Sequence, residues 1–141
     1  MAFQNIEIKD FSVETASDLD CLKFVAEKKW GDGFECRKCG HTNYCKGKIP
    51  FSRRCTRCKH DESATANTIF HRCHIPIKEA FYIVHRVCHD PAVSTYELSR
   101  QIELRQMTCW KLKARLMDCI KSRGEIDLLY TAKENNFNGK I

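Results

Sequence analysis

The chain has 141 residues, ten of them cysteine, and a net charge of +6 at pH 7. We expect a cytoplasmic protein without disulfides, because no apolar run approaches about 18 residues and the first residues do not resemble a secretory signal. Residues 36 to 60 carry eight basic and no acidic side chains, whereas residues 1 to 35 carry four basic and eight acidic ones. This concentration of positive charge suggests a polyanion partner, with a solvated surface as the alternative.

The first predicted element is a short amphipathic helix over residues 16 to 30. Ser17 suits its N-cap, acidic residues fill its first turn, and lysines fill its last turn. Gly31 and Gly33 are expected to end it. From Phe34 to about residue 70 the sequence is broken by Gly and Pro and rich in Thr, Ser, Phe and Ile, which favours short strands over helices.

Two cysteine pairs lie in this second region. Cys36 and Cys39 form one C-x-x-C, and Cys55 and Cys58 form another after an interval of fifteen residues. This spacing is within the range of a four-cysteine zinc site, in which two knuckles supply four thiolates to one Zn²⁺. Four thiolates leave no coordination position for water, so the predicted metal is structural. Gly40 is expected to relieve the tight turn of the first knuckle.

Other cysteines and histidines offer alternatives. The segment ECRKCGHTNYC also contains His41 and Cys45, which, with His60, are the rival ligands, but none of them makes as regular a pair. A redox pair is another use of a C-x-x-C motif. Such a motif normally precedes a helix in an α/β setting, and two copies spaced for one metal argue against a redox role here. The HRCH segment at residues 71 to 74 suggests a second metal site, although surface histidines at a strand-to-helix junction are the favoured interpretation. Four further cysteines are predicted to be small buried residues: Cys21, Cys88, Cys109 and Cys119.

Three helices are predicted beyond Pro76. The first keeps an apolar face at helical spacing, and the second begins with a capping box formed by Ser94 and Glu97. A short turn, ELR, precedes a third helix over about residues 105 to 122. Three helices with such short links fit a helix-turn-helix.

The third of these helices has a predicted core face, extended along an adjacent flank by Trp110, Ala114 and Met117, and what remains polar is a narrow stripe. In a helix-turn-helix the first turns of the second helix enter the major groove, so side chains there are candidates for base and phosphate contacts. Similar stripes also occur on protein-interaction helices. The DNA-binding candidates are Arg105, Gln106, Thr108, Lys111 and Arg115 on the helix, and Arg53, Arg54 and Arg57 in the basic region.

These elements together predict a small α+β protein. A four-cysteine zinc ribbon of short antiparallel strands is flanked by an N-terminal helix and a C-terminal three-helix helix-turn-helix. The predicted parts are an N-terminal helical segment (1–33), the zinc ribbon (34–75), the helix-turn-helix (76–123) and a flexible tail (124–141).

Three segments carry a family resemblance: WGDGFECRKCGH, RRCTRCKHDESATANTIFHRCHIPIKEAFYIV and STYELSRQIELRQMTCWKLKARLM. They resemble the N-terminal region of bacterial insertion-sequence transposases, in which a zinc ribbon and a helix-turn-helix precede a DDE-type catalytic domain. The resemblance covers about residues 10 to 120. It implies binding to double-stranded DNA at the terminal inverted repeats of a mobile element, in the bacterial cytoplasm at the nucleoid. A full-length transposase or a second copy of this chain is a further implied partner.

The chain departs from that pattern at two positions, with Asn67 where the family often has Gly and Arg105 where it often has a small capping residue. The family's catalytic carboxylates lie in a domain beyond this region. Asp127 faintly resembles the first of them, but one carboxylate cannot assemble a two-metal site. We therefore expect these 141 residues to bind DNA without cleaving it. The alternative function is a zinc-ribbon adaptor or regulator contacting protein or RNA.

Overall fold

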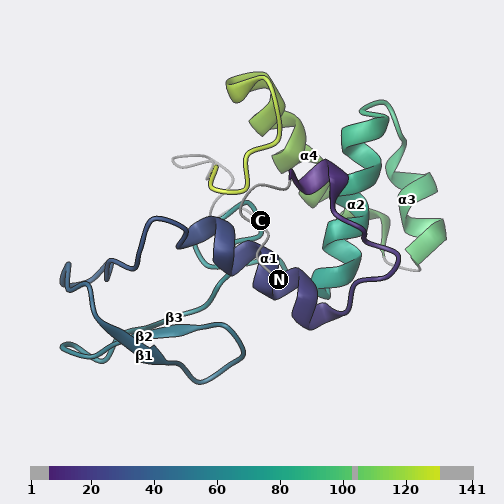
Figure 1. Cartoon of the computed structure of the whole chain (residues 1–141). Helices are drawn as coiled ribbons and strands as arrows, with labels where there is room; N and C mark the ends of the chain where they lie inside the picture. Colours follow the sequence, from purple (N-terminus) through teal and green to yellow (C-terminus); the bar gives the residue numbers. More distant parts are fainter. Residues whose placement is uncertain (1–6, 103–104, 131–141) are drawn as a thin grey trace.

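The computed structural model describes residues 7–102 and 105–130. In Figure 1 the strands lie at one end of the molecule, the last three helices lie at the other, and α1 lies between them. This is the small α+β architecture predicted from the sequence. The elements, in chain order, are η1 (Ile8–Asp10), α1 (Asp18–Lys29), β1 (Tyr44–Lys46), β2 (Arg53–Cys55), β3 (Asp61–Glu62), α2 (Ile77–His89), α3 (Thr95–Ile102) and α4 (Gln106–Arg123).

Helix α1 begins where the sequence predicts. The Ser17 hydroxyl accepts a hydrogen bond from the backbone N–H of Asp20 at 3.1 Å, and the Asp20 carboxylate accepts one from the Ser17 N–H at 3.1 Å. This reciprocal capping box satisfies two N–H groups that have no partner inside the helix. The helix ends at Lys29 with Trp30 as its C-cap, and Gly33 adopts a left-handed φ of +113° just beyond it.

The sheet is small and antiparallel, in the order β1-β2-β3. Tyr44 lies opposite Cys55 in the first pairing, and Arg54 lies opposite Asp61 in the second. Between residues 34 and 62 the buried side chains are Phe34, Cys36, Ser52, Cys55 and Glu62. Only one of these is a large apolar group, so the sheet region cannot be stabilised by a hydrophobic core of its own.

The main core lies among the helices and is rich in phenylalanine. The ring centroid of Phe24 on α1 lies 4.7 Å from that of Phe11 and 5.8 Å from that of Phe81 on α2. Phe70, which follows the sheet, stacks on Phe81 at 5.3 Å. The segments before and after the ribbon, predicted as separate parts of the chain, therefore share one core in space.

The three C-terminal helices begin close to the predicted residues, and the capping box predicted for α3 is formed in part. At α3 the Ser94 hydroxyl accepts the Glu97 N–H at 3.0 Å, whereas the Glu97 carboxylate accepts a hydrogen bond from Gln101 Nε2. On α4 the buried residues include Leu112 and Leu116, as the spacing predicts. No helix within the described ranges is long and apolar enough to cross a membrane.

The segment after α4 differs from its prediction. Residues 124 to 130, predicted to begin a flexible tail, pack against the body, and both Leu128 and Tyr130 are buried. The Ile69 N–H donates to the Leu128 carbonyl at 2.8 Å, and the Tyr130 hydroxyl donates to the carboxylate of Asp118. Apolar side chains after the helix end provide this packing, because burying them is favourable. The remainder of the predicted tail, residues 131–141, lies outside the described residues.

Candidate metal centre and nucleic-acid interface

The two cysteine knuckles have the same backbone geometry. The N–H of the first cysteine in each donates to the carbonyl five residues later, from Cys36 to His41 at 2.8 Å and from Cys55 to His60 at 2.9 Å. His41 and His60 therefore take part in the knuckles through their carbonyl oxygens. The N–H of the residue four positions on then donates back to the cysteine carbonyl, which closes each turn.

The residue that closes the turn has a left-handed backbone in both knuckles. Gly40 has a φ of +82° in the first knuckle, as predicted, and Lys59 has a φ of +68° in the second. A non-glycine residue pays roughly 1–2 kcal/mol for this conformation. The second knuckle is therefore less stable by itself and depends more on metal binding to stay closed.

The four thiols converge on one point. All four Sγ atoms lie within 4.8 Å of one another. Those of Cys36 and Cys58 are 3.6 Å apart, and those of Cys39 and Cys55 are 3.5 Å apart. Four sulfurs placed about 2.3 Å from a tetrahedral Zn²⁺ are separated by about 3.8 Å. The donor set therefore fits zinc in both chemistry and spacing.

Backbone N–H groups favour the thiolate form that zinc requires. The N–H groups of Arg57 and Cys58 donate to the Cys55 sulfur at 3.3 and 3.4 Å. Burial raises the pKa of the Cys55 thiol, but these hydrogen bonds and those of the neighbouring thiols outweigh it and lower the pKa to about 6. The same pair of N–H bonds reaches Cys36 from Lys38 and Cys39.

The side chains of the rival ligands do not belong to the thiol cluster. Cys45 is exposed on β1, opposite Arg54 of β2. Within the part of the chain that the structure describes, the four knuckle cysteines are the one group of Cys, His, Asp and Glu side chains with metal-ligand spacing. In the HRCH segment, the Nδ1 atom of His71 accepts a hydrogen bond from the Asn67 N–H at 2.9 Å. Asn67 has a φ of +59°, the left-handed conformation that asparagine tolerates.

The burial of His71 and the positive charges around it make a pH prediction possible. Burial, followed by the charges of Arg72 and Arg115, lowers the pKa of His71 below its ordinary value of 6.5. The unfolded chain therefore binds the proton at higher pH than the folded chain, so the free energy of unfolding should decrease as pH falls through about 6.5 and level off below the folded pKa. The expected result is a His71-dependent decrease between about pH 7.5 and pH 5.5.

His71→Asn keeps a hydrogen-bond acceptor but has no group that titrates in this range. Urea unfolding of the zinc-loaded wild type and variant should show a difference in unfolding free energy that decreases toward acid pH. The pH dependence of zinc binding is common to both proteins and cancels. A difference that stays constant with pH would contradict the prediction.

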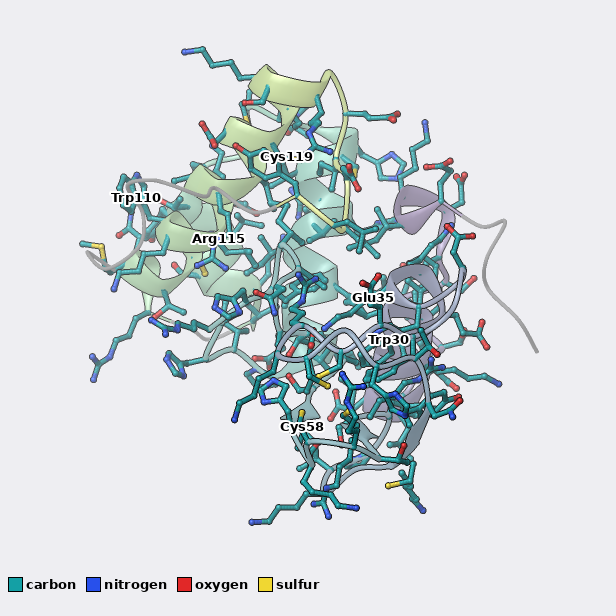
Figure 2. The ribbon with its side chains drawn as sticks, turned by 90° about the vertical axis from the view of Figure 1, so that its left-hand side faces the viewer. Trp30, Glu35, Cys58, Trp110, Arg115 and Cys119 are labelled. Atoms are coloured by element: carbon teal, nitrogen blue, oxygen red, sulfur yellow. The ribbon has the colours of Figure 1, made fainter. Side chains whose placement is uncertain are left out.

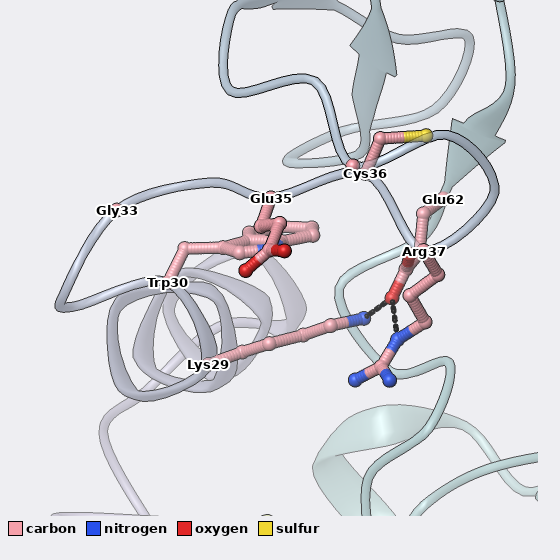
Figure 3. A pocket seen from close by; sticks show the side chains of 8 residues that line it. Lys29, Trp30, Gly33, Glu35, Cys36, Arg37 and Glu62 are labelled. Carbon is pink, nitrogen blue, oxygen red and sulfur yellow. Dashed lines mark hydrogen bonds and ion pairs between the residues drawn. The ribbon is translucent and has the colours of Figure 1, made fainter.

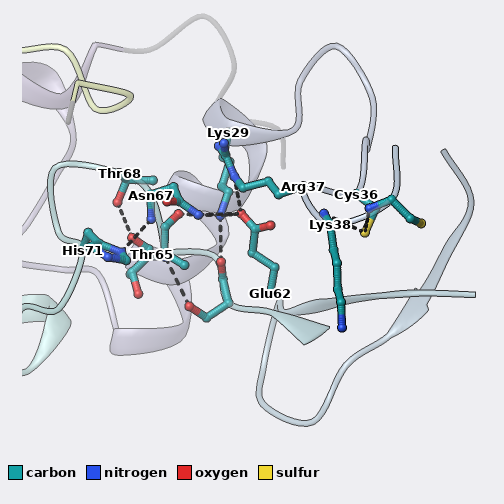
Figure 4. A network of polar contacts seen from close by, with 12 residues as sticks. Lys29, Cys36, Arg37, Lys38, Glu62, Thr65, Asn67, Thr68 and His71 are labelled. Carbon is teal, nitrogen blue, oxygen red and sulfur yellow. Dashed lines mark hydrogen bonds and ion pairs between the residues drawn. The ribbon is translucent and has the colours of Figure 1, made fainter. Parts of the chain in front are cut away.

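A buried ionic group joins the ribbon to α1 (Figures 3 and 4). The Lys29 ammonium lies 2.6 Å from the Glu62 carboxylate and donates to the carbonyls of Ser63 and Ala66 at 2.9 and 2.6 Å. The two charged side chains are only 3% and 4% exposed. Arg37, next to the first zinc-site cysteine, donates through Nε to the same carboxylate at 3.0 Å. The sequence offers no local sign of this contact, since its partners come from different elements.

Lys29 and Arg37 keep Glu62 in its ionised, carboxylate form. Burial raises the pKa of Glu62, but the hydrogen bonds and charges of Lys29 and Arg37 outweigh it, and the net shift is downward. For Lys29, burial is the largest effect and lowers the pKa, although Glu62 opposes it. A cavity of about 530 Å³ lies beside the ion pair; its lining includes Trp30, Gly33 and Glu35 (Figure 3).

The DNA-binding candidates on α4 have different environments. Arg105 is exposed at the N-cap and makes no side-chain cap bond. Gln106 is exposed, and its Nε2 donates to the Thr95 hydroxyl at 3.3 Å. Thr108 and Lys111 are half-buried and line a cavity with Arg115. The structure thus places the predicted side chains along one helix with its first turn open to solvent.

Arg115 has a structural contact that the sequence does not indicate. Its Nη1 donates to the carbonyl of Ile69 at 2.9 Å and to that of His71 at 2.8 Å. In Figure 2, Trp110 lies at the edge of the molecule and Arg115 lies nearer its centre. Arg115 therefore holds the segment after β3 against α4.

The three candidate arginines of the ribbon also contact the protein itself. The Arg53 guanidinium lies 4.6 Å from the Trp30 ring centroid and 4.1 Å from that of Tyr44. Arg54 pairs with Asp61 at 3.3 Å, and Arg57 donates through Nη2 to the Cys39 carbonyl at 3.0 Å. Exposed positive charge on the ribbon comes mainly from lysines: Lys38, Lys46, Lys48 and Lys59.

Asp127 pairs with a nearby arginine. Its carboxylate accepts a hydrogen bond from Arg123 of α4 and another from the Leu129 N–H at 3.0 Å. These contacts tie the segment after α4 to the end of that helix.

Comparison with known proteins bears on the ribbon. Residues 16–61 match the family model of the transposase zinc-ribbon domain. Searches of curated proteins and of solved structures gave no match. The matched range includes α1, both knuckles, β1, β2 and the first residue of β3, and it confirms the resemblance for this segment. The match and the four-cysteine cluster together support one structural zinc ion, and residues 16–61 are similar to the zinc ribbon of transposases.

Proposed function

We propose that this protein is a sequence-specific DNA-binding module of transposase type, which recognises the terminal inverted repeats of a mobile element. The observation that carries the proposal is the open first turn of α4. Arg105, Gln106 and Met107 are exposed there, while Cys109 and Leu112, further along the helix, are buried. This is how a helix-turn-helix presents its second helix to the major groove.

The positions of α2 and α3 support the same function. Helix α4 packs on both, and a link of three residues, 103 to 105, separates it from α3. Gln106 lies at the exposed end, and glutamine suits a bidentate hydrogen bond to an adenine edge. The exposed lysines of the ribbon add sequence-independent attraction to phosphates, because neutralising phosphates releases condensed counterions.

The proposal predicts discrimination between DNA sequences. Zinc-loaded protein should bind a duplex that carries the element's terminal repeat about 1,000-fold more tightly than a scrambled duplex of the same composition, at physiological salt. Fluorescence anisotropy titrations with the two duplexes measure the ratio of the Kd values. Gln106→Ala should reduce this discrimination by about 1–3 kcal/mol. Lys121→Ala, an exposed residue near the other end of α4, is the control and should leave it unchanged.

An adaptor that contacts protein or RNA is the second candidate. It is favoured by exposed apolar side chains on α4: Met107 is 61% exposed, Trp110 is 53% exposed and Met117 is 37% exposed. Apolar groups gathered on one face of a helix often mark an interaction site. Equal Kd values for the terminal and scrambled duplexes would contradict the DNA-reading proposal and favour the adaptor.

A further inference from the structure

A cationic cavity lies between α4 and the segment that joins β3 to α2. Its volume is about 340 Å³, which is within the roughly 300–1,000 Å³ typical of ligand sites. Three of its eight lining residues carry a permanent positive charge and none is acidic. The lining consists of Arg72, Cys73, His74 and Ile75 from the segment and Thr108, Lys111, Leu112 and Arg115 from α4.

The two walls are fixed to each other by the protein. Arg115, on α4, donates through Nη1 to the carbonyls of Ile69 and His71. His71 directly precedes Arg72 in the chain. The Cys73 N–H donates to the Phe70 carbonyl at 3.0 Å and closes the turn that contains Arg72. The cavity therefore does not need a ligand to bring its walls together, which reduces the entropy lost on binding.

Arg72 is held in an unusual conformation. It is exposed and has a left-handed φ of +56°. For a long side chain this conformation costs about 1–2 kcal/mol, and such strain is found more often at functional sites. Arg72 lines the cavity on the wall formed by this segment, and Lys111 lines it on the wall formed by α4. Burial and the charges of Arg72 and Arg115 lower the pKa of the neighbouring His71, which is consistent with a local excess of positive charge.

The chemistry of the lining selects a phosphate group. Guanidinium and ammonium groups form charge-assisted hydrogen bonds with phosphate oxygens, and the Thr108 hydroxyl adds a neutral donor. The lining has no carboxylate to accept a ribose hydroxyl and no Phe, Tyr or Trp on which a base could stack. A nucleotide is therefore recognised poorly here, whereas a backbone phosphate needs only the groups that are present.

We propose that this Arg72–Lys111 pocket binds one phosphodiester of the nucleic-acid backbone and so fixes the position of α4 on the duplex. The inference rests on the proposed function and deepens it, because it adds Arg72 from outside the helix to the interface. Thr108 and Lys111 follow the exposed turn of α4, so a duplex contacted by that turn has a phosphate close to the pocket. The contact contributes affinity and register but no sequence preference.

The test is the salt dependence of binding to a scrambled duplex. Arg72→Asn removes the charge but retains a residue that tolerates a left-handed backbone. Lys111→Ala removes the charge on the opposite wall, and Lys121→Ala is the matched control on the same helix. The slope of log Kobs against log salt, measured by anisotropy, should become less steep by about 0.9 for each pocket variant and remain unchanged for the control. The Kd ratio of terminal and scrambled duplexes should not change.

The outcomes separate this proposal from the function on which it rests. If folded, zinc-loaded Arg72→Asn and Lys111→Ala bind DNA with the wild-type slope, the pocket assignment is wrong and the DNA-binding function stands. If the wild type binds neither duplex, the proposed function is wrong. The assignment of a nucleic-acid phosphodiester to the pocket is then wrong as well. Tight binding of inorganic phosphate combined with wild-type slopes would also overturn the proposal, because it would indicate a site for free phosphate.

Discussion

Removal of zinc should unfold residues 34 to 62 and leave α2, α3 and α4 helical. Phe34 is the one large apolar side chain that is buried in this stretch, whereas the helices share the core formed by residues such as Phe24, Phe70 and Phe81. Zinc binding to a small site of this kind contributes on the order of 10 kcal/mol, which exceeds what the three short strands can supply. Amide hydrogen exchange before and after chelation measures the effect segment by segment.

Two cysteine variants test the ligand assignment. Cys55→Ser removes a thiolate from the cluster and should lose stoichiometric zinc, measured by elemental analysis of the purified protein. Cys45→Ser is the matched control, since Cys45 is exposed on β1 and outside the cluster, and it should retain one zinc per chain. Loss of zinc in the control, or full retention in Cys55→Ser, would overturn the assignment.

The hydrogen-exchange experiment has its own contradicting outcome. If chelation leaves the amide protection of residues 34 to 62 unchanged, the metal does not stabilise the ribbon.

Lys29→Met should lower the free energy of unfolding by about 3 kcal/mol. The variant leaves the Glu62 carboxylate buried with only the half-exposed Arg37 as a counter-charge, and it leaves the Ser63 and Ala66 carbonyls without their donor. Removing one member of a buried ion pair costs more than the pair itself contributes, because the remaining charge is desolvated without compensation. Urea unfolding at saturating zinc measures the change.

A double variant distinguishes the ion pair from simple loss of packing. Lys29→Met combined with Glu62→Leu removes both charges and should be less destabilised than Lys29→Met alone, since no carboxylate is then left uncompensated. Lys121→Met, on the exposed face of α4, is the control for introducing methionine. If Lys29→Met changes stability no more than this control does, the ion pair does not hold the ribbon to α1.

Local signals account for much of what the sequence predicts correctly. The N-cap at Ser17, the C-x-x-C spacing and the left-handed Gly40 each depend on residues close to one another in the chain. The core face of α4 follows from helical periodicity alone. Lys59 shows the limit of such signals, because its left-handed backbone repeats that of Gly40 without the residue type that normally indicates it.

The sequence by itself determined the presence of a four-cysteine metal site, the order of helices and strands, and the concentration of positive charge around the ribbon. Only the tertiary structure decided the role of each charged side chain: Arg53 packs between Trp30 and Tyr44, Arg115 holds two carbonyls, and Lys29 pairs with Glu62. The physical reason is that residue type and spacing specify what a side chain can do within its own element. Its partner comes from a distant segment, and the fold determines which segments meet.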